Sequence, residues 1–462
     1  MAITGCKKFL DKPFDNRLDI RTVDNLQEVV RNGYPTKYDI FTDIMTDSYF
    51  IFPSLMQAAW KPLYTPIFLF DDEYEFNLNF ASPATSYTHF YNRIYMSNNV
   101  IEEIGAVSGD QAQKDVILAE ALLVRAYSYF VLTNLFGMHY NETTSSTDLG
   151  VPLVLEVNKE NRPTYNRATV KELYDQIEAD LLKAIQIYEK SPSIVTNNPY
   201  QFSVPAAYAF ACRYYLYKAD YGKTIEYASK TIQLKGLVLR DLNKDLSYQS
   251  QFGWPYFTSQ MNDPSTHPNI IMASQSNYIH QAVGNNWGGF FIDRTLMSKI
   301  TENDLRRRYF SNAGTVNDNA NWAGKNVYDW NTSRYIMFGM EEVLLNRAEA
   351  YMKIQNPNKA AALEDINVFN RTRYRIYTDL SSSLENDKVL DAIMFQRQVE
   401  FLAEGLRWYD VKRLGIKVEH KIDVNSDKVD ATLMPNDKRT ALQIPGNARI
   451  GNPNLENQLN PR

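Results

Sequence analysis

The stretch FQRQVEFLAEGLRWYDVKRLG (395–415) places opposite charges at helical spacing among apolar residues. On one continuous helix, a charged stripe would run through Arg397, Glu400, Glu404 and Arg407, at steps of three, four and three residues. The two carboxylates could be a catalytic pair, or all four charges could form a partly buried ion ladder that fixes the helix to its neighbours. The adjacent arginines favour ionised carboxylates, which suits ion pairing and not general acid catalysis. The sequence therefore predicts a structural ion ladder in the last helix of the chain.

Most of the long segments before this stretch also show helical periodicity. In residues 169–190, for example, apolar side chains recur every three or four positions and would share one face of a helix. The expected single helices cover residues 22–34, 86–106, 114–137, 169–190 and 385–414, and two helix pairs cover residues 205–235 and 340–373.

A weak repeat of small and aromatic residues indicates how the helices pack. A small residue, an aromatic residue three positions later and a small residue nine positions after that occur at Cys212, Tyr215 and Thr224, and again at Ala348, Tyr351 and Ala360. This spacing resembles the tetratricopeptide (TPR) helix pair, in which small residues let two helices touch. The sequence therefore predicts a mainly α fold built on a TPR-like helix-pair scaffold.

The helical pattern is lost between residues 236 and 335. Gly, Asn, Pro and Trp crowd the segments QFGWPYFTSQMNDPSTHPN (251–269) and GNNWGGFF (284–291), and such residues interrupt regular structure. Long irregular segments in compact proteins are usually functional or disordered, and the aromatic residues argue against disorder. We therefore expect an irregular, loop-rich insertion that packs against the helical scaffold.

Composition and charge exclude several classes of protein. The net charge is −5 and no basic run exceeds residues 306–308, so the chain lacks the concentrated positive face that binds nucleic acid. No stretch of about 18 apolar residues is evident, so the sequence predicts no membrane-spanning helix. The two cysteines, Cys6 and Cys212, are too few for a disulfide framework or a cysteine-based zinc site. Cys212 lies in an apolar helical run and is expected to be a buried thiol.

The sequence contains no recognisable catalytic or metal-binding pattern. HExxH, GxSxG, P-loop and GxGxxG motifs are absent. The acidic cluster at residues 71–75 lacks the alternating ligands of an EF-hand, so a solvated turn is expected in place of a calcium site. A glycosidase would need two carboxylates across a cleft, and nothing in the sequence pairs two. We therefore predict no catalytic residue, no cofactor and no metal.

Four separated motifs, in order, resemble those of the SusD/RagB family. They are AEALLVRAYSYFVLTNLFG (119–137), RYIMFGMEEVLLNRAEAY (334–351), the stretch at 395–415 and IPGNARIGNPNLENQLNP (444–461). SusD/RagB proteins are nutrient-binding outer-membrane lipoproteins of Bacteroidetes. The chain departs from the family pattern at Gln396 and Ala448, where the family usually has Glu.

The resemblance implies a fold and a function. The fold would be a single SusD-like unit with an N-terminal extended segment (1–21), a part with TPR-type helices (22–235), the insertion (236–335) and a C-terminal part (336–462). The protein would capture an oligosaccharide without catalysis and deliver it to a SusC-like TonB-dependent transporter. Two alternatives remain open: a RagB-like peptide-binding lipoprotein, and a TPR-type scaffold without a small ligand.

A lipid anchor is expected at the N-terminus. The residues ITGC (3–6) fit the lipobox of a bacterial lipoprotein, in which a cysteine after a small residue carries the acyl chains. The charged start and apolar stretch of a signal peptide do not precede it, so we expect them upstream of residue 1. The resemblance implies lipid on Cys6 and a surface-exposed position on the outer membrane, reached through the lipid anchor alone.

Aromatic side chains are the best candidates for ligand contacts, because a flat ring can support the apolar C–H face of a sugar. Glycan-binding members of the family use an aromatic platform built from the segment after the first helix and from the insertion. By type and place, the candidates are Trp60, Tyr64, Tyr87, Trp254, Tyr256 and Trp287, with Trp322 and Trp330 in second rank. The alternative for each is simple packing in the core, because Trp is usually largely buried.

Overall fold

The computed structural model describes residues 22–36, 39–75, 80–157, 163–245, 262–276, 289–316, 319–325, 333–423 and 425–462. Its helices are α1 (Val23–Asn32), α2 (Lys61–Phe68), α3 (Pro83–Glu103), α4 (Gln111–Phe136), α5 (Val170–Lys190), α6 (Val204–Tyr217), α7 (Tyr221–Lys235), α9 (Arg294–Lys299), α10 (Met340–Lys353), α11 (Lys359–Arg371), α12 (Asn386–Glu400), α13 (Arg407–Leu414) and α14 (Gly446–Gly451). Its strands are β1 (Tyr49–Ile51), β2 (Ile270–Ser276), β3 (Phe290–Ile292), β4 (Phe310–Val316), β5 (Asn319–Lys325), β6 (Ser333–Gly339), β7 (Val418–His420) and β8 (Ala431–Leu433). The prediction of a mainly α fold is confirmed.

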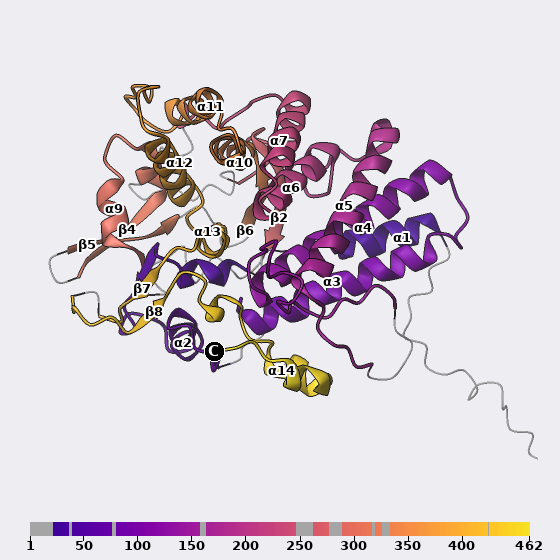
Figure 1. Ribbon diagram of the computed structural model, residues 1–462. Coiled ribbons are helices and arrows are strands. Elements are labelled where there is room, and N and C mark those ends of the chain that lie inside the picture. Colours follow the sequence, from indigo (N-terminus) through magenta and orange to yellow (C-terminus); the bar gives the residue numbers. More distant parts are fainter. Residues whose placement is uncertain are drawn as a thin grey trace, which may run out of the picture.

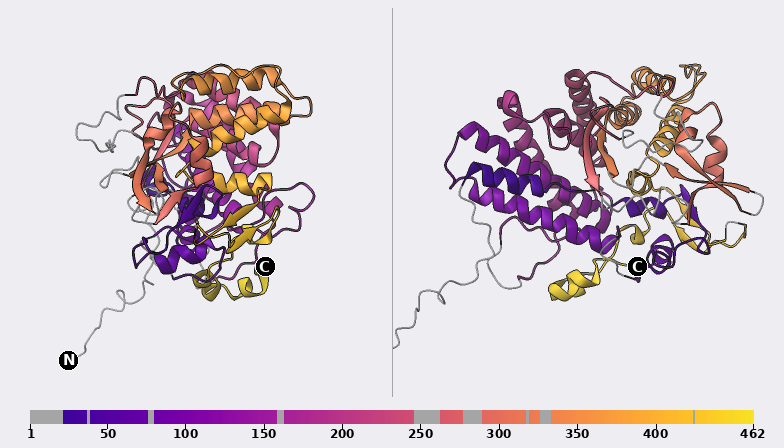
Figure 2. Two further views of the ribbon diagram at one scale, coloured as in Figure 1. Left: turned by 90° about the vertical axis from the view of Figure 1, so that its left-hand side faces the viewer. Right: turned by 180° about the vertical axis from the view of Figure 1, so that it is seen from behind.

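The longer helices pack side by side, with contacts that run from α3 through α4, α5, α6, α7 and α10 to α11 and α12 (Figure 1). Helix α4 packs against both α3 and α5, and α10 packs against α7, α11 and α12. The insertion elements α9, β4 and β5 lie at the opposite end of the molecule from α1 and α5, and α14 lies near the C-terminus below the helices (Figures 1 and 2). The arrangement is consistent with the predicted TPR-like scaffold.

Helix α5 shows how the sequence determines a scaffold helix. The Thr169 hydroxyl accepts a hydrogen bond from the backbone N–H of Glu172, and the Glu172 carboxylate accepts one from the backbone N–H of Thr169. This capping box satisfies N–H groups that the first turn would otherwise leave unpaired. The predicted apolar face is buried, including Leu173, Ile177 and Leu181, so the helix is held by packing along its whole length.

The small–aromatic repeat is only partly matched. Cys212 on α6 and Thr224 on α7 are fully buried, and Ala348 on α10 is fully buried as well. Ala360, in contrast, is exposed at the start of α11, and the buried small residue of that turn is Ala362. The second copy of the repeat therefore does not place its third residue in the helix contact.

The sequence analysis predicted no segment that is long and apolar enough to cross a membrane. Helix α4 contradicts this prediction by its length and composition. An 18-residue window of α4 has a mean hydropathy of 1.6, but 89% of that window is buried inside the protein. Such burial is typical of the core helix of a globular fold, because neighbouring helices cover all its faces. Among the described residues, α4 alone passes this test of length and hydropathy.

Strand pairs attach the insertion to the scaffold. Strand β1 pairs antiparallel with β3, which joins the insertion to the N-terminal part. Strand β2 pairs antiparallel with β6 and places Ser276 opposite Ser333. Strands β4 and β5 form a hairpin within the insertion. The described part of the insertion thus contains more regular structure than the expected irregular loop.

The last predicted helix, over residues 385–414, is two helices. Helix α12 ends at Glu400 and α13 begins at Arg407. Between them, Ala403 and Gly405 have positive φ angles of 59° and 71°, which a right-handed helix does not allow. The backbone N–H of Gly405 donates to the carboxylate of Asp43 at 3.0 Å, so the turn is anchored to the N-terminal part of the chain.

Candidate functional site

Two of the predicted ligand aromatics belong to the core. Trp60 is 3% exposed and packs edge-on against Phe80, and Tyr64 is 2% exposed and packs edge-on against Phe290. A ring enclosed in this way presents no face to a ligand. The prediction that Trp60 and Tyr64 contact the ligand is therefore corrected: both rings face the interior because the first turns of α2 pack on the core.

Tyr87 lies at the edge of a hollow of about 370 Å³. It is itself buried, but Tyr91 and Tyr95 continue its row along α3, and Tyr165 faces them. We call these four residues the tyrosine groove. Its remaining lining is largely apolar, so the groove offers few partners for the hydroxyl groups of a sugar.

Four of the predicted aromatic residues and the predicted lipidation site are not among the residues that the structure describes. Trp254, Tyr256, Trp287, Trp330 and Cys6 lie outside the described residues.

A second hollow of about 370 Å³ lies within the insertion and is lined by residues of β3, α9, the segment that follows α9, and β5. We call it the insertion hollow and define it by the polar and aromatic residues Arg294, Ser298, Thr301, Glu302, Arg307 and Trp322. A volume of this size lies within the range of small-molecule sites. Its described lining carries three charged side chains beside the aromatic ring, whereas the described lining of the tyrosine groove carries one, Glu156.

Local contacts fix the elements around the insertion hollow. Helix α9 is capped by Asp293, whose carboxylate accepts a hydrogen bond from the backbone N–H of Leu296 at 3.0 Å. Asp304 precedes a 3₁₀ helix, η5 (Leu305–Tyr309), and its carboxylate both caps this helix and pairs with Arg306 at 2.7 Å. The short helices thereby hold Arg307 against the hairpin.

Trp322 and Arg307 form the centre of the insertion hollow. The guanidinium carbon of Arg307 lies 4.6 Å from the centroid of the partly buried Trp322 ring, which is cation–π geometry. Arg307 also donates from Nη1 to the carbonyl oxygen of Ile300 at 2.8 Å and pairs through Nε with Glu302 at 2.7 Å. These contacts fix the arginine and, through it, the indole ring.

The side chains of the insertion hollow suit the binding of a sugar. An indole ring can support a pyranose, while arginine and the hydroxyls of Ser298 and Thr301 can hydrogen-bond to its oxygens. Glu302 is the sole carboxylate among the described residues that line the hollow, whereas most glycosidases use two. No group of three or more His, Cys, Asp or Glu side chains in the described ranges could hold a metal ion.

Sequence reasoning found this site only in part. Trp322 was a second-rank candidate, and Arg294 and Arg307 had no assigned role. Arg307 belongs to the basic run at residues 306–308, which was the available signal. The spacing of residues in the sequence does not reveal that the Arg307 guanidinium packs on the indole ring of Trp322, fifteen positions later.

The predicted ion ladder is also corrected. Because α12 ends at Glu400, the four charges do not share one helical stripe. Arg397 pairs with Asp410 at 3.1 Å, and Arg407 pairs with Asp47 at 2.7 Å. Glu404 lies in the turn and lines a cavity with Glu400. The charges thus connect the turn and both helices to other parts of the chain.

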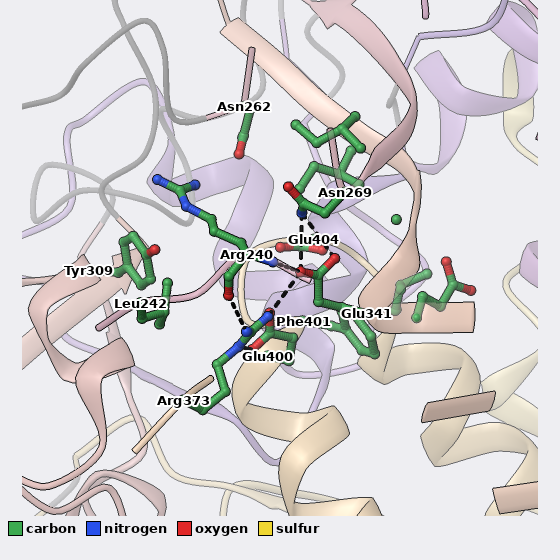
Figure 3. Close-up of a pocket in the computed structure, with 15 residues that line it drawn as sticks. Arg240, Leu242, Asn262, Asn269, Tyr309, Glu341, Arg373, Glu400, Phe401 and Glu404 are labelled. Carbon is green, nitrogen blue, oxygen red and sulfur yellow. Dashed lines mark hydrogen bonds and ion pairs between the residues drawn. The ribbon is translucent and has the colours of Figure 1, made fainter. Parts of the chain in front are cut away.

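Glu400 belongs to a buried charge network around a small cavity (Figure 3). Arg373 donates to Glu400 at 2.7 Å and to Glu341 at 3.1 Å, and Arg306 donates to Glu400 at 3.3 Å. Asn269 donates to both oxygens of Glu341, at 3.0 and 3.1 Å. The cavity is about 60 Å³, enough for a water molecule or two but not for a sugar ring. The network therefore joins the insertion to α10 and α12 and is not a ligand site.

The comparisons with known proteins agree with this fold. A family model described as "Starch-binding associating with outer membrane" matches residues 8–216, and the SusD family model matches residues 186–460. Among similar proteins are two from Formosa agariphila: SusD-like protein P38 is 22% identical over 407 residues, which cover 75% of each chain, and SusD-like protein P2 is 24% identical over 439 residues, which cover 79% of this chain and 78% of the relative.

Solved structures share the architecture over nearly the whole chain. A SusD superfamily protein from Bacteroides thetaiotaomicron has a TM-score of 0.73 at 22% identity and covers 96% of this chain and 100% of its own. A surface glycan-binding protein A from Bacteroides uniformis has a TM-score of 0.66 at 15% identity and covers 94% and 98%. Because the SusD family model alone spans more than half of the sequence, this chain belongs to the SusD family.

Proposed function

We propose that this SusD-family protein captures an oligosaccharide in the insertion hollow and delivers it to a SusC-like TonB-dependent transporter. The observation that carries the proposal is the partly buried Trp322 ring, held by Arg307 and flanked by polar groups. Family membership supports a glycan-binding role, and the structural neighbour from Bacteroides uniformis is a surface glycan-binding protein. The lining of the hollow favours retention of the ligand without turnover.

The proposed position in the cell follows from the family and from Cys6. The family description associates these proteins with the outer membrane. Several acyl chains on one cysteine would give stable anchoring, whereas a single chain binds only marginally. The protein would then sit at the cell surface beside its transporter, attached through the lipid alone.

Affinity electrophoresis through a panel of polysaccharides tests the proposal. The wild type should be retarded by at least one polysaccharide, and Trp322→Ala should lose most of the retardation, because the variant lacks the flat apolar ring that would support the sugar. Tyr95→Ala is the matched control, since it removes an exposed ring (45%) that lies on α3, outside the insertion hollow.

Each outcome supports a different function. Loss of retardation in Tyr95→Ala but not in Trp322→Ala would move the site to the tyrosine groove. Shortened glycan products would contradict a non-catalytic role. No retardation by any polysaccharide, with retention of extended peptides, would favour the RagB-like alternative. Capture of the transporter without any small ligand would favour the scaffold alternative.

A further inference from the structure

The insertion hollow carries an excess of positive charge. Arg294 and Arg307 line it, and Glu302 is the one carboxylate among its described lining residues. Two more cations, Lys299 and Arg308, are exposed on the same two short elements. The hollow is therefore positive on a chain whose net charge is −5. A local excess of one sign in a concave site attracts ligands of the other sign.

The ion pair between Arg307 and Glu302 is open to competition. The Glu302 side chain is 88% exposed, whereas the Arg307 side chain is 22% exposed. Exposed ion pairs contribute little to stability, because water and salt screen the attraction. A ligand anion could thus displace Glu302 while Arg307 keeps its other contacts, to the Ile300 carbonyl and to the Trp322 ring.

Arg294 is held beside the hollow by different contacts. Its guanidinium carbon lies 5.4 Å from the centroid of the Phe50 ring, and Nη1 donates to the side-chain oxygen of Asn425 at 3.1 Å. A guanidinium held in this way has lost part of its conformational freedom before a ligand arrives. Less entropy is then lost when it pairs with a carboxylate or a sulfate.

We propose that the insertion hollow selects glycans that carry an anionic group, a uronate carboxylate or a sulfate ester. Trp322 supports the apolar face of the sugar ring, while Arg307 and Arg294 pair with the anion. Arginine suits this task because its planar fork of N–H groups matches the oxygens of carboxylates and of related oxyanions. The proposal rests on the proposed function, since it names the ligand class of that same site.

Paired polysaccharides test the proposal and distinguish the two anions. Polygalacturonate is compared with its methyl ester, and carrageenan with its desulfated form, so that each pair differs mainly in its charged group. The wild type should bind one anionic member about tenfold or more tighter than its neutral partner, the difference expected for a charge-assisted hydrogen bond. The preference should shrink as NaCl is raised, because salt screens exposed charges.

Three charge variants identify the residues responsible. Arg307→Gln should lose the preference for the anionic partner. Glu302→Gln should strengthen binding of the anion, because it removes the carboxylate that competes for Arg307. Since the Glu302 side chain is exposed, this substitution should not disturb folding. Arg308→Gln removes the same charge one residue away, from an exposed side chain outside the lining, and should retain the preference.

The inference and the proposed function fail in different ways. The anionic selection would be overturned if charged and neutral partners bound equally, and if Trp322→Ala weakened this binding while Arg307→Gln left it unchanged. Glycan capture in the insertion hollow would then still stand. An equal loss of the preference in Arg307→Gln and Arg308→Gln would show general charge attraction and would also overturn the inference. No binding of any polysaccharide would overturn both proposals.

Discussion

Glu120 is a buried carboxyl group, and the folded protein favours its protonated form. It is 4% exposed on α4 and accepts a hydrogen bond from the hydroxyl of Tyr34, which itself accepts one from the backbone N–H of Phe202 at 2.8 Å. Burial raises the pKa of Glu120 from its ordinary 4.5 to about 7, although the hydrogen bond from Tyr34 opposes the rise. The neutral form of this side chain is therefore the one that suits the folded state.

The raised pKa of Glu120 predicts a pH dependence of stability. The unfolded chain releases this proton near pH 4.5 and the folded chain near pH 7, so the contribution is fully present below about pH 4.5 and is lost as the pH rises through about 7. Glu120→Gln, which is always neutral, should raise the free energy of unfolding at pH 8 by on the order of 3 kcal/mol and change it little at pH 4.5. Thermal unfolding at the two pH values measures this.

Glu103→Gln is the control, because Glu103 is exposed at the end of α3. It should leave the difference between the two pH values as in the wild type. Retention of the wild-type pH dependence in Glu120→Gln would contradict the assignment to this carboxyl.

The turn between α12 and α13 shows what helical spacing does not reveal. The charges at residues 397–407 fit one continuous helix, yet the chain turns at residues 401–406 because the backbone of Gly405 takes a left-handed conformation and bonds to Asp43. Gly405 was the available signal, since glycine takes positive φ without the penalty that a Cβ brings. Periodicity predicted most of the helices. It does not distinguish one continuous helix from two successive helices whose apolar residues keep the same spacing.

Gly405→Ala should destabilise the protein by roughly 1–2 kcal/mol, because an alanine at φ 71° carries the left-handed penalty. Ala403→Gly at φ 59° is the matched change in the opposite direction. It removes the same strain but makes the unfolded chain more flexible, so the two effects partly cancel. Chemical denaturation of both variants measures the difference, and equal destabilisation by both would argue against strain as the cause.

The strand pairs illustrate a second limit of sequence reasoning. β1 lies in the N-terminal part of the chain and its partner β3 lies in the insertion, while β2 and its partner β6 are separated by residues 277–332. No local pattern encodes a partner more than fifty residues away. For the same reason the candidate site was predicted by composition, as an aromatic insertion, while the contact between Arg307 and Trp322 became visible only in the fold.

At the scale of the whole molecule, buried ion pairs hold α10, α12 and α13 together. Glu349 is fully buried and pairs with Arg413 at 2.7 Å and with Lys353 at 2.9 Å. Burial alone would raise the pKa of Glu349, but the charge of Arg413 and its hydrogen bonds lower it to about 2. The ionised carboxylate is thus part of the folded state.

The lowered pKa of Glu349 predicts acid sensitivity. Its stabilising contribution is present above its ordinary pKa of 4.5 and is lost as the pH falls to about 2, because the unfolded state binds the proton first. Glu349→Gln should be about 3–5 kcal/mol less stable at pH 7, since it leaves buried cations without their partner. The gap between variant and wild type should narrow as the pH falls from 4.5 towards 2, as followed by urea unfolding.

Glu364→Gln, on an exposed position of α11, is the control and should follow the wild type at every pH. A constant gap between Glu349→Gln and the wild type across this range would contradict a role for the ionised carboxylate.

The pairing of β2 with β6 has a consequence for how such a protein can change over generations. Because Ser276 lies opposite Ser333, the strand pair brings together the two ends of the segment between them. The entropy of closing such a loop depends only logarithmically on its length, so even a doubling adds about 0.6 kcal/mol. Changes of length within this segment should therefore cost the helical scaffold little, provided that they keep the pairing of β3 with β1 and the contact of Arg306 with Glu400. The strand pair thus lets the insertion change over evolution more freely than the helices that carry it.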